Sequence, residues 1–327
     1  METIVVSVHC LTYNHEKFIA EAIESFLMQK TNFKFEILIH DDASTDRTPE
    51  IIKEYELKYP GLIKPIFQSE NQYSKRKSFN TLNLNNLIRA KGKYIAVCEG
   101  DDYWIDPYKL QKQVDMMENN PNCSLCVHGG YIVTAAEKKV LLKNRPYKKD
   151  KVFTVDEVIE GGGGLFLTNS MVFRKNYGLE TPEFLEKAPV GDYPYVIHFS
   201  LLGEVCYIDE LMSAYRLGHS GSWTATEFNN IEIKKRHYSE IEKMLDNLNV
   251  YTDSQYNDVI TRTKIKTQIS FLLEQRNYYE IKKGIYKEYY LELSFKRKLI
   301  IFMDQFSPFI SRILRGVKRR VSVWTSI

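Results

Sequence analysis

Three carboxylates within four positions, Glu99, Asp101 and Asp102, are the side chains of this chain best placed to do chemistry. Carboxylates this close repel one another unless a cation or a set of hydrogen-bond donors lies among them. Oxygen ligands of this kind suit Mg²⁺ or Mn²⁺ that carries phosphate groups. The pattern leaves two interpretations open, a metal site and an acidic loop that is merely solvated. Since a loop carboxylate contributes little to a core, replacing Asp102 is expected to leave the fold intact.

The element that positions these acids is an apolar run from Tyr94 to Cys98, which reads as a short buried strand. Gly100 follows it, at a point where the backbone turns sharply or approaches a ligand closely. In open α/β sheets, ligands bind beyond the carboxyl ends of the strands. The acids are therefore expected on the ligand-binding edge of a sheet.

Two earlier segments repeat this arrangement of a strand followed by polar residues. A strand predicted over residues 4–11 ends at Thr12, Tyr13 and Asn14, and one predicted over residues 35–40 ends at Asp41 and Asp42. Helical apolar spacing follows each strand, and such βαβαβ alternation predicts parallel strands. All these polar residues should then share one edge, where an Asp carboxylate can accept from a base N–H or a ribose hydroxyl.

Helix capping is the alternative role for the acids after the second strand. A cap supplied by Asp46 or Thr45 would account for residues 44–46. It requires neither Asp41 nor Asp42, which remain candidates for binding a nucleotide.

Residues 7–14, 41–46 and 99–104, taken together and in this order, resemble the family 2 glycosyltransferases. The likeness covers about the first 220 residues. It implies the GT-A fold, an α/β architecture with a Rossmann-like, mostly parallel sheet flanked by helices. It also implies a sugar donor activated by a nucleotide diphosphate, with uridine diphosphate as the default, a Mn²⁺ or Mg²⁺ ion, and inversion at the anomeric carbon.

The resemblance also implies roles for single residues. The nucleotide would be bound by Thr12, Tyr13, Asn14, Asp41, Asp42 and Asp101. Asp102 is expected to be the direct metal ligand, with His219 and Glu99 as further candidates. The family often has Asp where this chain has Glu99, which leaves the part of Glu99 in metal binding open. Arg216 and Trp104 are candidates for contact with the diphosphate or the acceptor.

Asp192 is the candidate catalytic base by the same resemblance. An acceptor hydroxyl must lose its proton as it attacks the anomeric carbon, and a positioned carboxylate can take that proton. The alternative is that Asp192 simply caps the helix predicted over residues 195–202.

The chain is predicted to divide into a catalytic domain over residues 1–225, a helical extension over 226–295 and a basic amphipathic segment over 296–327. From Pro308 onward, apolar residues recur at helical spacing. They are Phe309, Ile310, Ile313, Leu314, Val317, Val321 and Trp324. Arg and Lys residues flank this stripe, which suits the surface of an anionic membrane. A helix packed on protein is the alternative.

Composition narrows the function further. A net charge of +3 does not favour a nucleic-acid partner, and no run of eighteen apolar residues predicts a transmembrane helix. The first residues lack the pattern of a secretory signal. Five cysteines, an odd number, favour reduced thiols. The expected location is cytoplasmic, with peripheral attachment to the inner face of the membrane as an extension of it.

The sequence thus predicts an inverting hexosyl- or N-acetylhexosaminyltransferase. Its expected acceptor is a hydroxyl of a glycan or a lipid-linked precursor in surface polysaccharide synthesis. No Gln-x-x-Arg-Trp segment occurs, so transfer of a single sugar is favoured over processive synthesis. Two alternatives remain, a nucleotidyltransferase of related fold and a non-catalytic nucleotide-sugar-binding protein. The first class usually begins with a glycine-rich, basic phosphate loop near the N-terminus, which this sequence does not have. The retained Asp101, Asp102 and Asp192 argue against the second.

Overall fold

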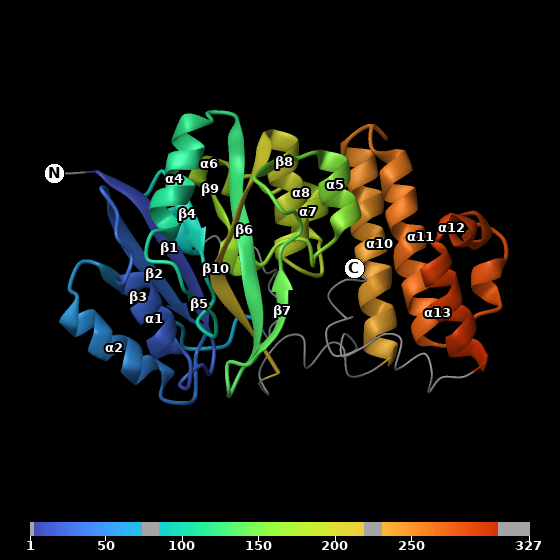
Figure 1. Cartoon of the computed structure of the whole chain (residues 1–327). Coiled ribbons are helices and arrows are strands. Elements are labelled where there is room, and N and C mark those ends of the chain that lie inside the picture. The colour runs from blue at the N-terminus through green and yellow to red at the C-terminus, as the bar shows by residue number, and fades with distance from the viewer. Residues whose placement is uncertain (1–2, 74–84, 219–230, 307–327) are drawn as a thin grey trace.

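A computed structural model describes residues 3–73, 85–218 and 231–306 of the chain. One ten-stranded sheet runs through the larger part of the molecule, with helices on both of its faces (Figure 1). Along the main path the strand order is β3-β2-β1-β4-β9-β6-β10-β5, while β7 pairs with β6 and β8 with β10.

The first four strands form the parallel block that the sequence predicts. They are β1 (Ile4–Thr12), β2 (Lys34–Asp41), β3 (Ile63–Phe67) and β4 (Tyr94–Val97). Each pair of neighbours in the block runs parallel. Helices α1 (Ile19–Leu27) and α2 (Thr48–Lys58) connect the strands, and α2 has Pro49 in its first turn, where the missing N–H costs nothing.

The second half of the sheet is mixed in direction. It contains β5 (Tyr103–Trp104), β6 (Cys123–Thr134), β7 (Val140–Asn144), β8 (Lys151–Phe153), β9 (Val172–Arg174) and β10 (Glu204–Leu217). β9 lies antiparallel between β4 and β6, and β10 runs parallel to β6. β7 is an antiparallel partner of β6.

Short helices cover the second half of the sheet. They are α4 (Lys109–Asn119), α5 (Val155–Gly161), the 3₁₀ turn η1 (Thr168–Ser170), α6 (Lys175–Gly178), α7 (Glu183–Glu186) and α8 (Asp192–Leu202). A capping box fixes the start of α5, where Thr154 and Glu157 satisfy each other's backbone amides. α8 is the helix that carries Asp192 to the ligand-binding edge.

The helical extension is confirmed, and its helices contribute to two separate cores. It comprises α10 (Ile231–Tyr251), α11 (Asn257–Glu274), the 3₁₀ turn η2 (Glu280–Lys282), α12 (Tyr286–Glu292) and α13 (Phe295–Phe306). Leu245 and Val259, from the first two helices, share a core with α5 and α8. Ile281 of η2 and Ile301 of α13 belong to a separate small core, against which side chains of α12 also pack.

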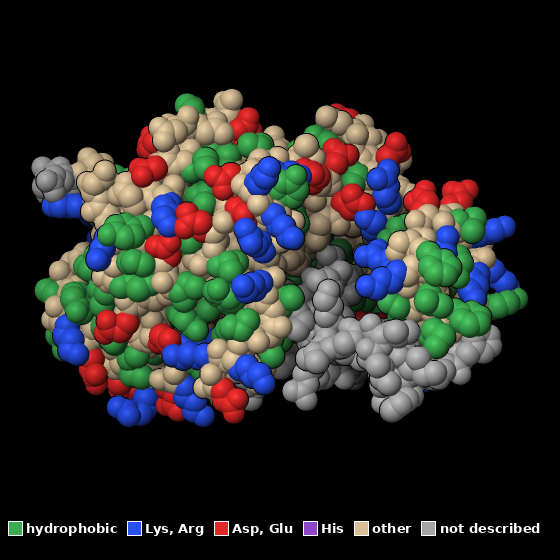
Figure 2. Space-filling view, in the orientation of Figure 1, with side chains coloured by type: hydrophobic (Ala, Val, Ile, Leu, Met, Phe, Trp, Pro, Cys, Tyr) green, Lys and Arg blue, Asp and Glu red, His purple; other side chains and the backbone are tan. Residues whose placement is uncertain are grey.

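Apolar and basic side chains lie together on the end of the molecule formed by α12 and α13 (Figure 2). Phe295 and Phe302 expose 82% and 51% of their surfaces. The apolar stripe predicted from Pro308 onward lies outside the described residues. Within the described ranges, no helix has the length and apolar character needed to cross a bilayer.

Candidate active site

The carboxyl ends of β1, β2 and β4 meet at one edge of the sheet, as the sequence predicts. Thr12 pairs with Asp41 across β1 and β2. On the other side of β1, the Gly100 amide donates to the Leu11 carbonyl at 2.9 Å. A methyl group on Gly100 would lie 2.7 Å from the Thr12 hydroxyl, so only glycine lets the acidic turn approach β1 this closely.

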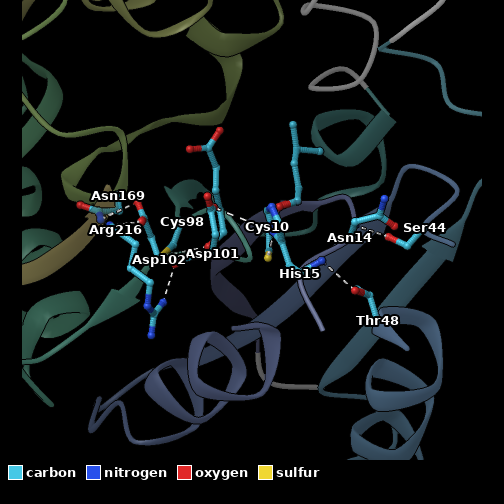
Figure 3. Close-up of polar contacts among 12 residues, drawn as sticks. Cys10, Asn14, His15, Ser44, Thr48, Cys98, Asp101, Asp102, Asn169 and Arg216 are labelled. Carbon is cyan, nitrogen blue, oxygen red and sulfur yellow. Dashed lines mark hydrogen bonds and ion pairs between the residues drawn. The ribbon is translucent and has the colours of Figure 1, made fainter. Parts of the chain in front are cut away.

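The loop after β1 is joined to the loop after β2 by reciprocal polar contacts (Figure 3). The Asn14 amide donates to the Ser44 hydroxyl at 2.8 Å, and the Asn14 side-chain oxygen accepts from the Thr45 amide at 2.7 Å. Asn14 has a φ of 55°, a left-handed conformation that Asn tolerates better than most residues. The contacts hold this loop in a fixed shape, and the neighbouring Tyr13 is 43% exposed on it.

Asp41 and Asp42 both have partners within the chain. Asp41 accepts from the amide and the hydroxyl of Ser44, and burial raises the pKa of its carboxyl group. Asp42 accepts from the amides of Gln72 and Tyr73 at 2.8 and 3.0 Å. Asp46, by contrast, accepts from the amide of Thr48, the first residue of α2, while the N-cap position itself is Arg47, which makes no side-chain cap. Contact of Asp41 and Asp42 with a nucleotide stays a prediction.

Asp102 is buried, with only 1% of its surface exposed. One carboxylate oxygen accepts from the Arg216 amide at 2.8 Å and the other from the Asn169 side-chain amide at 2.9 Å (Figure 3). Burial, followed by the charges of Asp101 and Glu99, raises the pKa of this carboxyl group well above its usual range. The expectation that Asp102 contributes little to the fold is wrong, because it ties β10 and η1 to the end of β4. Its role as a metal ligand remains a prediction.

Asn169 is a residue of this network that sequence reasoning missed. It is fully buried in η1, where its side-chain oxygen accepts from the Ser213 hydroxyl at 2.6 Å. Its backbone carbonyl accepts from the Trp104 indole N–H at 2.9 Å. The available signal was a stretch of three polar residues, 168–170, in the otherwise apolar run of residues 165–173. Trp104 is 1% exposed and packs on Phe26 with ring centroids 4.8 Å apart, so it forms part of the support beneath the site.

Arg216 lies beneath the acidic turn. Its guanidinium donates to the Asp101 carbonyl and to the carboxylate of Glu21, and it lies over the Tyr103 ring at 4.4 Å. Only 1% of the surface of Arg216 is exposed. Its hydrogen bonds to the Asp101 carbonyl and the Asp102 carboxylate hold the acidic turn in place. His219, the other residue predicted in this segment, lies outside the described residues.

Glu99 and Asp101 are the members of the acidic turn that keep some exposure. The Asp101 carboxylate lies 3.9 Å from His15 Nδ1, and its side chain is 15% exposed. Burial, followed by the charges of Asp101 and Asp192, raises the pKa of Glu99 to about 8. The charges of Asp101, in the same turn, and of Asp192, in α8, therefore both disfavour ionisation of the Glu99 carboxyl group. A cation placed here would relieve that repulsion.

A metal ion fits this donor set only together with further ligands. The described parts of the chain contain no group of three or more His, Cys, Asp or Glu side chains arranged to hold a metal ion. Mg²⁺ is usually bound through one or two carboxylates, with phosphate oxygens and waters completing its shell. Glu99 and Asp101 could supply that share, so the residues present fit an ion that is bound jointly with a diphosphate.

Asp192 is the first residue of α8. One of its oxygens accepts from the Tyr193 amide at 2.7 Å, and burial raises the pKa of its carboxyl group above the ordinary value. Asp192 also lines a small cavity that extends between α8 and the ends of β1 and β4, where His9 and Val97 lie. The N-cap of α8 is Gly191, and no side chain caps the helix, so the contact with Tyr193 is a local contact within the first turn. The role of Asp192 as catalytic base stays a prediction.

Comparisons with known proteins agree with this picture. The model of the family described as Glycosyl transferase family 2 matches residues 7–176, just over half of the chain. An uncharacterised protein of Mycobacterium bovis is 34% identical over 219 residues, which make up 67% of this chain and 60% of that protein. The match therefore spans less than two thirds of the relative's length.

Solved structures share the architecture at low sequence identity. S. aureus TarS 1-349 in complex with UDP-GlcNAc has a TM-score of 0.59 at 16% identity, over 98% of this chain and 84% of that chain. The mannosyltransferase PcManGT from Pyrobaculum calidifontis, in complex with GDP-Man and Mn²⁺, has a TM-score of 0.57 at 13% identity, over 98% and 88%. These likenesses confirm the expected fold, including the helical C-terminal region.

Proposed function

The chain belongs to glycosyl transferase family 2, and we propose that it is an inverting transferase that moves one sugar from a nucleotide diphosphate to an acceptor hydroxyl. The observation that carries this proposal is the position of acids from two elements at the carboxyl ends of β1 and β4. Glu99 and Asp101 lie in the turn that follows β4, and Asp192, the first residue of α8, lines a cavity together with Val97, the last residue of β4. A reaction centre between these acids would have the donor's diphosphate on one side and a proton acceptor on the other.

Asp101 and Glu99 are the acids that face the donor. This assignment moves the metal contact from Asp102, the first expectation, to its neighbour. It is supported by the exposure of Asp101 and by the two protein donors that occupy Asp102. Asp102 and Arg216 then act as positioning residues that fix the turn.

A bound Mn²⁺ or Mg²⁺ would neutralise charge on the departing diphosphate. The residues that hold the ion on the protein side are Asp101 and Glu99. His219 remains a further candidate ligand from the sequence. The solved structure of PcManGT is a complex with GDP-Man and Mn²⁺, which makes Mn²⁺ the first ion to try.

Asp192 is the catalytic base. As the acceptor oxygen forms its bond to the anomeric carbon, the bond from that carbon to the diphosphate breaks, and the hydroxyl proton passes to Asp192. Burial favours the protonated product of this step, because it raises the pKa of the carboxyl group. The second carboxylate oxygen of Asp192, which does not bond to Tyr193, is the one that takes the proton.

The nucleotide lies over the ends of β1 and β2, against Tyr13 and the joined loops that contain Asn14 and Ser44. The fixed shape of these loops supports the assignment, because a preformed surface loses little entropy on binding. Thr12, Asp41 and Asp42 shape the same surface from below. Uridine diphosphate is the default carrier.

The acceptor is a glycan or a lipid-linked precursor of a surface polysaccharide, used at an anionic membrane surface. The exposed Phe295, Leu299 and Phe302 on α13 support this location, since they continue the type of face predicted from Pro308 onward. Lys296 and Arg297 adjoin them, and each basic residue near an anionic surface contributes about 1 kcal/mol.

The test is a panel of sugar nucleotides incubated with Mn²⁺, with and without a chelator, in which release of the nucleoside diphosphate is measured. We expect one nucleotide sugar to give chelator-sensitive release that increases with acceptor. Binding without release across the panel would favour a non-catalytic binding protein. Release of pyrophosphate from a nucleoside triphosphate and a sugar phosphate would favour a nucleotidyltransferase.

A further inference from the structure

The cavity that Asp192 lines is apolar on most of its surface. Its apolar walls are Leu87, Val97, Met171, Phe173 and Phe199. Four of these side chains are at most 6% exposed, and the rings of Phe173 and Phe199 stack at 4.6 Å. The cavity measures about 40 Å³, roughly three times the space that one buried water needs. It therefore has room for a few non-hydrogen atoms, mostly apolar, next to the proposed base.

Tyr195 is one of the polar residues that line this cavity, together with His9, Thr168 and Asp192. It lies one helical turn after Asp192 on α8 and is only 7% exposed. Its hydroxyl has no hydrogen-bond partner among the described residues. Burying an unpaired hydroxyl is unfavourable, so this position is one where a ligand atom would find a ready partner. Burial also raises the pKa of Tyr195 to about 12, so the hydroxyl keeps its proton and can donate.

We propose that this cavity is a subsite for the acetamido group of an N-acetylated amino sugar. The methyl group would lie against the apolar walls formed by Leu87 and Phe173, and the carbonyl oxygen would accept from the Tyr195 hydroxyl. A sugar hydroxyl in the same place would leave the apolar walls poorly filled, and a bare methyl group would leave Tyr195 unpaired. The acetamido group meets both requirements with four non-hydrogen atoms.

The inference rests on the proposed function, because Asp192 marks the place where donor and acceptor sugars meet. Either sugar could bring the acetamido group to this point. The shared chemistry is therefore the N-acetyl substituent, and experiment must say which of the two substrates carries it.

Saturation-transfer difference NMR with Mg²⁺ present, which is diamagnetic, tests the subsite directly. The donor arm compares UDP-GlcNAc with UDP-glucose, and the acceptor arm compares the methyl glycosides of GlcNAc and glucose. In one arm the acetyl methyl protons should receive more saturation than the ring protons. Tyr195→Phe should weaken binding of that N-acetylated probe about five- to tenfold, the value of one neutral hydrogen bond, and leave its glucose counterpart unchanged.

Two further variants sharpen the test. Val97→Leu adds one methylene group to the cavity wall and should also weaken the N-acetylated probe selectively. Tyr193→Phe is the matched control, because Tyr193 lies on the same helix but its hydroxyl donates to the Ile159 carbonyl at 2.6 Å. That control should keep the preference for the N-acetylated probe.

The proposal is overturned if the acetyl methyl protons are not preferentially saturated in either arm, or if Tyr195→Phe weakens the N-acetylated and glucose probes equally. Failure of the proposed function has a different signature, since no sugar nucleotide would then release its diphosphate. Selective loss of methyl saturation in Tyr195→Phe would still establish the subsite in that case.

Discussion

Replacing Asp102 and Asp101 one at a time by Asn separates an acid that supports the fold from an acid that serves the donor. In Asp102→Asn, one of the two acceptor oxygens becomes an NH₂ group. Whichever way that amide turns, it faces a donor, either the Arg216 amide or the Asn169 side chain. At least one buried donor then loses its partner, in a position only 1% exposed.

The expected cost to the free energy of unfolding is about 2 kcal/mol. An unsatisfied buried polar group costs about 1–3 kcal/mol, and loss of the charge-assisted bonds adds to this. Removing the charge also relieves repulsion from Asp101 and Glu99, which lowers the total. Asp101→Asn should lower the free energy of unfolding less than Asp102→Asn does, because the Asp101 side chain is 15% exposed and its contact with His15 Nδ1 is at 3.9 Å.

Binding should show the reverse order. We expect Asp101→Asn to lose at least about tenfold in Mn²⁺-dependent affinity for the nucleotide diphosphate, while folded Asp102→Asn keeps most of it. Urea unfolding followed by circular dichroism gives the stabilities, and calorimetric titration with UDP or GDP and Mn²⁺ gives the affinities. If Asp102→Asn proves as stable as the parent yet no longer binds, and Asp101→Asn binds normally, then Asp102 is the metal ligand and the reasoning fails.

Three further outcomes are expected. Asp192→Asn should cut transfer by about 10²-fold or more with donor affinity unchanged; because burial raises the pKa of Asp192, the parent rate should fall as pH drops through a value above 3.8. Burial lowers the pKa of His237 to about 4, so between pH 6.5 and 4 the unfolded state binds more protons than the folded state. The free energy of unfolding of the parent should therefore fall by on the order of 3 kcal/mol across this window. In acid unfolding experiments, His237→Gln should show a smaller fall than the parent. The 327-residue chain should float with anionic liposomes at low salt more strongly than a chain ending at Ser307, which keeps α13, whereas flotation of neither would exclude the membrane contact.

The parallel half of the sheet was predictable because its signals are local. Continuous apolar runs such as residues 4–11 indicate strands buried on both faces, and helical periodicity between them fixes their direction. The strands β7 and β9 lack such signals. β9 has three residues, and its place between β4 and β6 depends on partners far along the chain. Short antiparallel insertions of this kind are decided by tertiary packing.

The different surroundings of Asp101 and Asp102 could not be predicted from the sequence for the same reason. The two acids are adjacent and chemically identical, so local pattern treats them alike. What distinguishes them is the arrival of Asn169 and Arg216, which lie 67 and 114 positions further along the chain. Both residues donate a hydrogen bond to the Asp102 carboxylate. The Arg216 guanidinium donates to the backbone carbonyl of Asp101. The Asp101 carboxylate lies 3.9 Å from His15 Nδ1, and its side chain is 15% exposed. A run of acids at a strand end thus predicts the chemistry of a site, while the distant donors that fold onto it decide which acid performs that chemistry.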